Sequence, residues 1–484
     1  MVDSVDCEKK SLAAAEKFRD WADSYLNFER TPQKNIFWLD TMRTLCASLG
    51  NPELSCRSFH IAGSKGKGSV SEMISSILSE AGFRTGLYTS PHILDFAERI
   101  KSADGYFSPE IYCSAAESVK DCVDGLEKNG AFGGRPVTWF ELVTAYGMEC
   151  FRRAGCDWAV YEVGLGGRLD ATNVILPECC CINRIELEHT EYLGDTIEKI
   201  AGEKGGIIKE GIPVVVGRQK ADSVREVFEK IASEKRSPII FADSETKISN
   251  IVYKSEQTDV KGSADNSYPV DKNTHTNLQV AMDFSMESRF FSRPINASLK
   301  MLGDFQADNA ALAATAVKQV FPDLDESIIE KGLSKASLPG RFEILGGGGN
   351  ILVLDGAHTP ASVSFTVETF LKVAGEKSAP HVLFACAADK DVEDIAPIFR
   401  DRFSRVTLTV PGSAKTSDLP RAENAFKSAG MDFESYPDYG LGIHHALESA
   451  QKKQTPLLVV GSFYLVSEVK KILIKESLRA GMKY

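Results

Sequence analysis

The sequence contains no long apolar run. No stretch of its 484 residues approaches the length and apolarity of a membrane-spanning helix, and the mean hydropathy is slightly negative, at -0.15. The first residues, MVDSVDCEKKSLAAAEKF, are acidic and amphipathic, which is not typical of a secretory signal peptide. We therefore expect a cytoplasmic protein that has no membrane partner.

Basic residues are in the minority. Lys and Arg number 56 against 67 Asp and Glu, which gives a formal net charge of -11, and the basic residues are scattered along the chain. Binding to duplex nucleic acid depends on a concentrated basic surface. The composition therefore argues against nucleic acid as the main partner, and any anionic ligand must be met by a local group of cations.

The sequence also lacks paired cysteine motifs. Its eleven cysteines are odd in number and form no C-x-x-C pair, and three of them stand together at 179–181 inside an apolar run. This pattern favours buried, reduced thiols over disulfides or a zinc site. It is typical of a protein in a reducing compartment.

The chain is longer than one hydrophobic core usually serves, and its length predicts two or three domains. Short apolar strands, glycine-rich loops and segments of helical periodicity alternate along it. This order predicts an α/β fold with a parallel sheet covered by helices. The clearest strands are expected at 57–62, 157–167 and 179–187, and the clearest helices at 69–83 and 141–155.

Two changes of composition suggest how the chain is divided. Residues 242–290 are rich in Ser, Asp, Asn, Thr and Lys, which indicates a loop insertion or a pair of irregular strands without an evident function. Further along, Pro339, Gly340 and a run of four glycines resemble a boundary, and more strands and helices follow without an internal repeat. We predict one domain at 1–337 and a second, smaller α/β domain at 338–484.

The stretch HIAGSKGKGSVSEM resembles a phosphate loop with altered spacing. Ile61 stands where the common pattern has its first glycine, and Gly68 separates Lys67 from Ser69. A flexible turn is the alternative interpretation. Because the glycines lie between a predicted strand and a predicted helix, backbone N–H groups, the helix N-terminus and Lys67 would meet at one anion. Ser69 is suited either to a phosphate or metal contact or to the N-cap of the helix.

GSKGKGS resembles the GTNGKGS loop of the Mur ligase superfamily, in its folylpolyglutamate synthase and dihydrofolate synthase branch. Further pieces resemble motifs of that family and occur in the same order between about residues 27 and 468: TSPHILDFAERI, TWFELVTAY, YEVGLGGRLDATN, EHTEYLGDTIEKIAGEKGGIIKEG, LGDFQADNAALA, PGRFE, LDGAHTP and GSFYL. The resemblance implies a Mur-ligase-like P-loop domain that binds ATP and folate, followed by a Rossmann-like glutamate-binding domain, in a monomer.

The resemblance implies a set of metal ligands. Ser90, Glu162 and His189 match the family's Mg²⁺ ligands, and Lys204 matches a lysine that is carbamylated to serve a second Mg²⁺. Taken singly, Glu162 is as typical of a salt bridge, Ser90 of a turn, His189 of a surface histidine and Lys204 of an exposed helical lysine. Glu188 stands where the family usually has Asp, and Gly205 replaces its usual Ala.

The resemblance also assigns residues to ATP and to the substrates. The implied ATP-binding residues are Gly63, Ser64, Lys65, Gly66, Lys67, Gly68, Ser69, Asn309, Arg341 and Asp355. The implied residues of the folate site are Thr138, Trp139, Phe140, Glu141, Leu169, Asp170 and Ala171, and Asp355, His358 and Ser462 match the glutamate-handling side. Without the family, Trp139 and Phe140 would be interpreted as core aromatics, and Thr359 departs from the family's usual Asn.

The implied reaction is ATP-dependent amide formation between a folate carboxylate and L-glutamate through an acyl phosphate. Lys67, Glu162, His189, Lys204, Arg341, Asp355 and His358 are the implied catalytic residues. Such chemistry needs charge neutralisation and positioning, and no Ser-His-Asp arrangement is evident. The alternatives are a cell-wall Mur ligase, a P-loop ATPase or kinase without glutamate ligation, and a non-catalytic nucleotide-binding protein. The sequence leaves open whether dihydropteroate is also a substrate.

Overall fold

The computed structural model describes residues 2–27, 38–259, 276–345, 351–375, 379–413 and 415–479. The chain divides into two compact units, and each unit is made of three segments. The first unit comprises Met1–Asn250, Phe284–Ala297 and Phe305–Ala336, and the second comprises Ile251–Asp283, Ser298–Asp304 and Ser337–Tyr484. The single domain boundary predicted between residues 337 and 338 leaves the two earlier segments of the second unit in the first predicted domain.

A seven-stranded sheet organises the first unit, in the order β3-β2-β4-β1-β5-β6-β7. All neighbouring strands are parallel except β2 and β3, which pair in antiparallel fashion at one edge. This sheet confirms the predicted α/β fold. Its strands are β1 (Arg57–Ala62), β2 (Thr85–Tyr88), β3 (Ile100–Ser102), β4 (Trp158–Glu162), β5 (Cys179–Ile182), β6 (Val214–Val216) and β7 (Ile239–Phe241).

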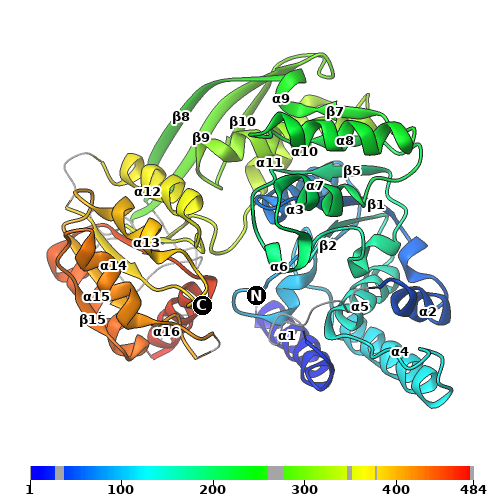
Figure 1. Ribbon diagram of the computed structural model, residues 1–484, viewed down its shortest axis with the longest axis horizontal. Coiled ribbons are helices and arrows are strands. Elements are labelled where there is room, and N and C mark those ends of the chain that lie inside the picture. The colour runs from blue at the N-terminus through cyan, green and yellow to red at the C-terminus, as the bar shows by residue number, and fades with distance from the viewer. Residues whose placement is uncertain are drawn as a thin grey trace. The chain divides into compact units, whose positions relative to one another are not determined.

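Helices cover this sheet and form two hydrophobic clusters with it (Figure 1). One cluster joins β2 and β4 to α1 (Val2–Ala22), α2 (Asp40–Ser48), α4 (Pro109–Lys128) and α5 (Trp139–Ala154). The other joins β5 and β6 to α7 (Ile197–Gly205) and α8 (Asp222–Glu234). The remaining helices of this part of the chain are α3 (Lys67–Glu80), α6 (Thr190–Leu193), α9 (Ala242–Glu245), α10 (Asp304–Val320) and α11 (Glu326–Lys335).

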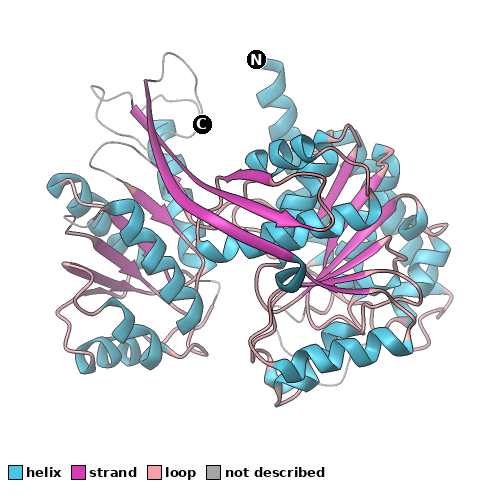
Figure 2. Cartoon of the chain, turned by 90° about the horizontal axis from the view of Figure 1, so that it is seen from above, coloured by secondary structure: helices cyan, strands magenta, loops and turns pink. Residues whose placement is uncertain are grey.

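The polar region at 242–290 contains two long, regular strands. The strands β8 (Thr246–Asp259) and β9 (Thr276–Ser288) belong to a three-stranded sheet in the order β10-β9-β8, completed by β10 (Ile295–Leu299). Figure 2 shows β8 and β9 as the longest arrows. The alternative of a loop is therefore wrong for these two segments, and the alternative of a pair of strands is confirmed, although both strands are regular. Residues 260–275 lie outside the described residues. The strands β9 and β10 bury alternate apolar side chains, such as Met282 and Ile295, whereas residues 247–254 of β8 are exposed or half-buried. The polar composition of the exposed positions hid this pattern.

The second unit is built on a six-stranded sheet in the order β11-β12-β16-β13-β14-β15. Only β11 runs antiparallel to its neighbour. The strands are β11 (Glu343–Leu345), β12 (Leu352–Leu354), β13 (His381–Phe384), β14 (Arg405–Thr409), β15 (Glu434–Tyr436) and β16 (Leu457–Val460). The helices are α12 (Pro360–Ala374), α13 (Val392–Ile395), α14 (Leu419–Ser428), α15 (Tyr439–Lys453) and α16 (Phe463–Arg479).

The cysteines at 179–181 lie on β5 and are fully buried, as the apolar run predicts. All eleven cysteines are free thiols in the structure. Among the helices of the described residues, none combines the length and the apolarity needed to cross a membrane.

Candidate active site

The glycine-rich loop connects the end of β1 to the start of α3. Gly66 is the N-cap of α3 and adopts a left-handed backbone conformation with φ of 78°, so the helix begins at Lys67. The sequence interpretation placed the first helical turn at Ser69, two residues too late, and offered Ser69 as an N-cap. That alternative is wrong, because the conformational freedom of glycine lets the chain turn into the helix earlier.

A chain of side-chain amides packs against this loop. Asn183, which follows β5, donates through Nδ2 to Oδ1 of Asn309 at 2.6 Å, and Asn309 donates to Oε1 of Gln306 at 2.8 Å. Gln306 in turn donates to Oγ of Ser69 at 3.3 Å. A side chain at Gly66 would overlap the amides of Asn183 and Asn309. The loop is therefore held against α10 by contacts that require glycine at this position.

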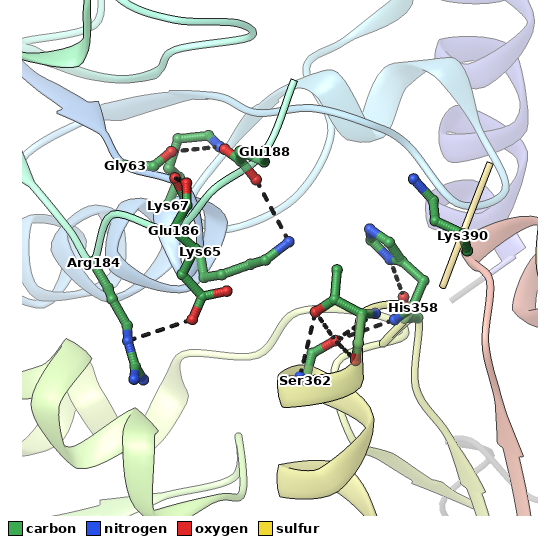
Figure 3. A network of polar contacts seen from close by, with 12 residues as sticks. Gly63, Lys65, Lys67, Arg184, Glu186, Glu188, His358, Ser362 and Lys390 are labelled. Carbon is green, nitrogen blue, oxygen red and sulfur yellow. Dashed lines mark hydrogen bonds and ion pairs between the residues drawn. The ribbon is translucent and has the colours of Figure 1, made fainter. Parts of the chain in front are cut away.

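Three lysines lie in or beside the loop, and Figure 3 labels two of them, Lys65 and Lys67. Lys67 and Lys204 each donate through Nζ to the backbone carbonyl of Gly63, at 3.0 Å in both cases. Lys204 also pairs with Oε1 of Glu188 at 3.1 Å, and Lys65 lies 3.6 Å from the other oxygen of that carboxylate. Lys204 is only 2% exposed, so it is not the exposed helical lysine that its sequence position suggests.

This charge cluster changes the acid–base properties of two groups. Burial disfavours the charged form of Glu188, but Lys204, Lys67 and Lys65 outweigh it and lower the pKa of this carboxyl to about 2. Burial together with the charge of Lys67 lowers the pKa of Lys204 to about 8, although the attraction of Glu188 opposes this shift. Lys204 thus loses its proton far more readily than an exposed lysine does.

Two of the implied metal ligands lie together at the carboxyl end of the sheet. Glu162 is the last residue of β4 and is buried, and its Oε2 accepts a hydrogen bond from the backbone N–H of Ser90 at 3.0 Å. His189 is exposed and precedes α6 in a left-handed conformation, with φ of 49°. Within the described ranges, no group of three or more His, Cys, Asp or Glu side chains is arranged to hold a metal ion.

The loop after β4 is organised by Asp170. This buried carboxylate accepts hydrogen bonds from the backbone N–H groups of Gly164 and Leu165 at 3.0 Å, and from the N–H and hydroxyl of Thr172. Burial raises the pKa of Asp170, although these hydrogen bonds oppose the shift. Asp170 is the N-cap of the short helix that begins at Ala171, so it fixes the shape of the loop that also carries Leu169.

The TWFE segment forms the start of α5. Thr138 is the N-cap, and its backbone N–H and hydroxyl both donate to Oε2 of Glu141, which completes a capping box. Trp139 is buried and donates from its indole to Oδ1 of Asp23 at 2.9 Å. Phe140 is only partly buried, and a side chain at Gly164 would overlap its ring. Only Phe140 of these four combines a large apolar surface with partial exposure.

The implied site residues of the second unit gather where β12 ends. Asp355 is buried and accepts hydrogen bonds from the backbone N–H groups of Phe342 and Ala357, both at 2.7 Å. Phe342 is in the left-handed region with φ of 51°, next to Arg341. Burial raises the pKa of Asp355, although the charge of Arg341 opposes this shift. Asp355 thus fixes the backbone beside the arginine.

His358, Thr359 and Ser462 also lie in this part of the second unit. Nδ1 of His358 pairs with the carbonyl of Gly356 at 2.8 Å, and Figure 3 shows His358 beside Ser362 at the start of α12. Thr359 is the N-cap of α12, where its hydroxyl accepts from the N–H of Ser362. Ser462 is buried, and its Oγ accepts from the N–H of Tyr464. Thr359 therefore has a structural role, as the N-cap of α12, that does not depend on a ligand.

Comparisons with known proteins show which family has this sequence and this fold. Residues 340–463 match the model of the Mur ligase, glutamate ligase domain. The chain is 30% identical over 470 residues to a Bacillus subtilis dihydrofolate synthase/folylpolyglutamate synthase, covering 96% of this chain and 100% of the relative. The chain belongs to the folylpolyglutamate synthase and dihydrofolate synthase family. This membership confirms the predicted family and fold.

Two further similarities extend the comparison with this family. A probable bifunctional folylpolyglutamate synthase/dihydropteroate synthase of Haloferax volcanii is 32% identical over 440 residues, which cover 89% of this chain but only 48% of the relative. The chain thus spans about half the length of that relative. A solved structure of Mycobacterium tuberculosis folylpolyglutamate synthase complexed with ADP is similar with a TM-score of 0.78 and 25% identity, covering 96% of this chain and 99% of the other.

The family motifs did not point to every residue that shapes the site. Asn183 and Gln306 were missed, although Gln306 stands three positions before Asn309 on α10, where both side chains share one helix face. Glu188 was noted only as a departure from the family's usual Asp, yet it is the carboxylate that balances the lysine cluster. The polar residue that follows a buried strand, as Asn183 follows β5, is the signal that finds such positions.

Proposed function

We propose that this chain is an ATP-dependent ligase that adds L-glutamate to the carboxylate of a folate. The substrate carboxylate attacks the γ-phosphorus of ATP and displaces ADP, which leaves an acyl phosphate. The amine of glutamate then attacks the acyl carbon, and phosphate leaves as the amide forms. Both steps gather negative charge on phosphoryl and acyl oxygens, so the protein's main contribution is fixed positive charge and orientation.

The observation that carries this proposal is the phosphate loop with its cations. The helix α3 begins at Lys67, so its N-terminus lies at the end of the loop. Three cations, Lys65, Lys67 and Lys204, lie in or beside the same loop. A helix N-terminus with adjacent lysines suits the phosphates of a nucleotide. The similar M. tuberculosis enzyme has been solved in complex with ADP, which supports a nucleotide as a ligand of this chain. We assign the remaining loop residues and Asn309 to the same ligand.

Mg²⁺ is assigned to Ser90, Glu162 and His189. Ser90 and Glu162 already touch, and both offer the oxygen ligands that this hard cation prefers, while few protein ligands leave room for water and phosphate. The ion would supply charge neutralisation for the phosphates.

Lys204 is assigned as a carbamylated ligand of a second Mg²⁺. Its amine is buried beside Glu188, and its lowered pKa of about 8 raises the fraction of neutral amine, which is the form that reacts with CO₂. The protonated amine first loses one proton, and the neutral nitrogen then forms a bond to the carbon of CO₂ and loses a second proton, so a cation becomes an anion. Two cations nearby, Lys65 and Lys67, would favour that anion.

The folate is assigned to the first unit and glutamate to the second. Phe140 and the loop shaped by Asp170, with Leu169 and Ala171, would contact the acceptor, and Thr138, Trp139 and Glu141 would hold Phe140 in place. In the second unit, Arg341 and Asp355 would act on ATP, and Asp355, His358 and Ser462 on glutamate. The match of residues 340–463 to a glutamate ligase domain supports this division.

Release of ADP that depends on both glutamate and a folate tests the proposal. The purified chain, ATP and Mg²⁺ should release ADP with tetrahydrofolate and glutamate together, and only at background level when either is omitted. Dihydropteroate belongs in the same panel, because the B. subtilis relative is named for both activities. ADP release without glutamate would indicate an ATPase or kinase, and activity only with a cell-wall precursor would indicate a Mur-type ligase.

A further inference from the structure

We propose that Phe463 is an aromatic positioning residue that holds Arg341 and His358 in their working orientations. This inference deepens the proposed function, since it rests on the assignment of Arg341 to ATP and of His358 to glutamate. Phe463 is the first residue of α16 and is half-buried. All the residues that carry the inference belong to the second unit.

The ring of Phe463 contacts both functional side chains. The guanidinium carbon of Arg341 lies 4.4 Å from the centre of the ring, inside the range of a cation–π interaction. The imidazole of His358 meets the same ring edge-on, with centroids 6.0 Å apart and planes at 62°. One aromatic side chain therefore restricts the two groups that are assigned to different substrates.

The backbone leaves space for the ring at Gly356. A side chain on this glycine would overlap the ring of Phe463, and Gly356 does not have a positive φ among the described glycines. Glycine is thus needed at this position for the close approach of the ring and not for an unusual backbone conformation. The N–H of Gly356 donates to the carbonyl of Gly340 at 3.0 Å, which ties the loop to the turn that carries Arg341.

The start of α16 is fixed to the same loop. The N–H of Gly461 donates to the carbonyl of Ala357 at 2.9 Å, and Oγ of Ser462 accepts from the N–H of Tyr464. The backbone on both sides of Phe463 is therefore tied down. The ring of Phe463 therefore has a fixed position against which the long side chain of Arg341 packs.

An aromatic support leaves the charge of Arg341 intact. A carboxylate in the same place would offset the positive charge, whereas a phenyl ring attracts the guanidinium without carrying a net charge. A hydrogen bond to the backbone also orients His358. Its Nδ1 pairs with the carbonyl oxygen of Gly356, which can only accept, so Nδ1 must carry a proton. This leaves Nε2 as the atom of the ring that can accept a hydrogen bond.

The test compares Phe463→Leu, Phe463→Tyr and Phe403→Leu by titration with the ATP analogue AMPPCP in the presence of Mg²⁺. Phe403 is the matched control, since it is also half-buried in the second unit but packs only against Phe370 and Phe399 among the rings recorded for it. We expect Phe463→Leu to weaken AMPPCP binding by about tenfold, and Phe463→Tyr and Phe403→Leu to stay within about twofold of the wild type. Unchanged binding in Phe463→Leu, or an equal loss in Phe403→Leu, would overturn the inference.

A double-mutant cycle with Arg341→Lys shows whether the ring acts through the arginine. If it does, Phe463→Leu should lose most of its effect on AMPPCP binding when Arg341 is already lysine. An undiminished effect in that background would overturn the assignment.

The four proteins of this cycle are the wild type, Phe463→Leu, Arg341→Lys and the double variant. They also give a measurement that does not depend on the proposed function. Urea unfolding of the ligand-free variants should show coupling between positions 463 and 341, even if the wild type releases no ADP in the presence of a folate and glutamate. An inactive wild type with this coupling would reject the ligase proposal alone. Absence of coupling in both measurements would reject the aromatic support alone.

Discussion

Two regions of this chain hold cationic side chains close to assigned ligand sites, and they do so by different means. Around the phosphate loop, Lys65, Lys67 and Lys204 are balanced by the carboxylate of Glu188 and by the carbonyl of Gly63. Around the end of β12, Arg341 instead lies over an aromatic ring. The first region is a set of mutually dependent charges, whereas in the second the cation of Arg341 contacts an uncharged ring in addition to acting on the carboxylate of Asp355.

The difference predicts how each region responds to change. Removal of one charge from the lysine cluster alters the pKa of its neighbours, because each of these shifts has charged causes. The contact between Arg341 and a phenyl ring contains no group that titrates near neutral pH. Substitution of a charged residue should therefore have its larger effect at the phosphate loop.

The largest effect is expected at Lys67. Lys67→Ala should lower kcat by at least about 100-fold, because it removes a full charge from the site where phosphate charge develops. The fold should persist, since the described hydrogen bond of this side chain is a single one to a backbone carbonyl. ADP release and thermal unfolding measure the two outcomes. Lys199→Ala, which removes an exposed lysine paired with Asp195, is the matched control. Near-normal turnover in a folded Lys67 variant would remove the basis for the phosphate-loop assignment.

A second large effect is expected at Lys204. Lys204→Ala should lose most activity, and high concentrations of a short carboxylic acid should restore part of it by occupying the vacated space. Lys204→Arg should remain inactive under both conditions, because arginine keeps the cation and does not form a carbamate. Activity assays with and without added acetate decide this. Full activity in Lys204→Arg would show that a positive charge is sufficient here and that carbamylation is not required.

A smaller effect is expected at the assigned metal ligands. Glu162→Gln and His189→Ala should each raise the Mg²⁺ concentration needed for half-maximal activity by about tenfold, because each removes a ligand from a hard cation. Glu178→Gln is the control, as that carboxylate pairs with Arg57 at the surface. Identical Mg²⁺ titrations in all three variants would place the metal at other residues.

The smallest effect concerns stability in acid. The pKa of Glu188 is depressed from its ordinary 4.5 to about 2, so its contribution to stability is present above pH 4.5 and is lost as the pH falls towards 2. A shift of this size corresponds to at most about 3 kcal/mol. Between pH 5 and pH 3, the free energy of unfolding should therefore fall more steeply in the wild type than in Glu188→Gln. Urea unfolding at several pH values measures both slopes, and equal slopes would contradict the balance of charges described above.

The order of strands and helices could be predicted because each element has a local signature. The strand at 57–62 and the helix after the glycine loop alternate apolar residues with the periods of their own geometry, and both appear in the structure. The alternation of strands and helices along the chain predicts a parallel sheet, but it does not give the number or the order of the seven strands. The bounds of α3 were less predictable, because the position of its N-cap depends on the left-handed conformation of Gly66 and not on periodicity.

The contacts within the site were predictable only in part. Motifs located the loop, Glu162 and Asp170, but the structural role of Asp170 in holding Gly164 and Leu165 depends on a loop path that the sequence does not specify. Asn183 and Phe463 act through contacts with residues more than 100 positions away. Such long-range pairs arise from tertiary packing, which a single sequence read by local pattern does not reveal.

The carbonyl of Gly63, which accepts from both Lys67 and Lys204, has a consequence for the speed and cost of ligand capture. A free lysine side chain gives up conformational entropy worth up to about 2 kcal/mol when it becomes ordered. Here both side chains are already docked on a neutral acceptor, so that cost is met during folding and not during binding. Under the proposed assignment, a bound nucleotide would take Lys67 from this carbonyl without having to order the side chain first. The resting loop is preorganised, and this favours rapid association as well as affinity.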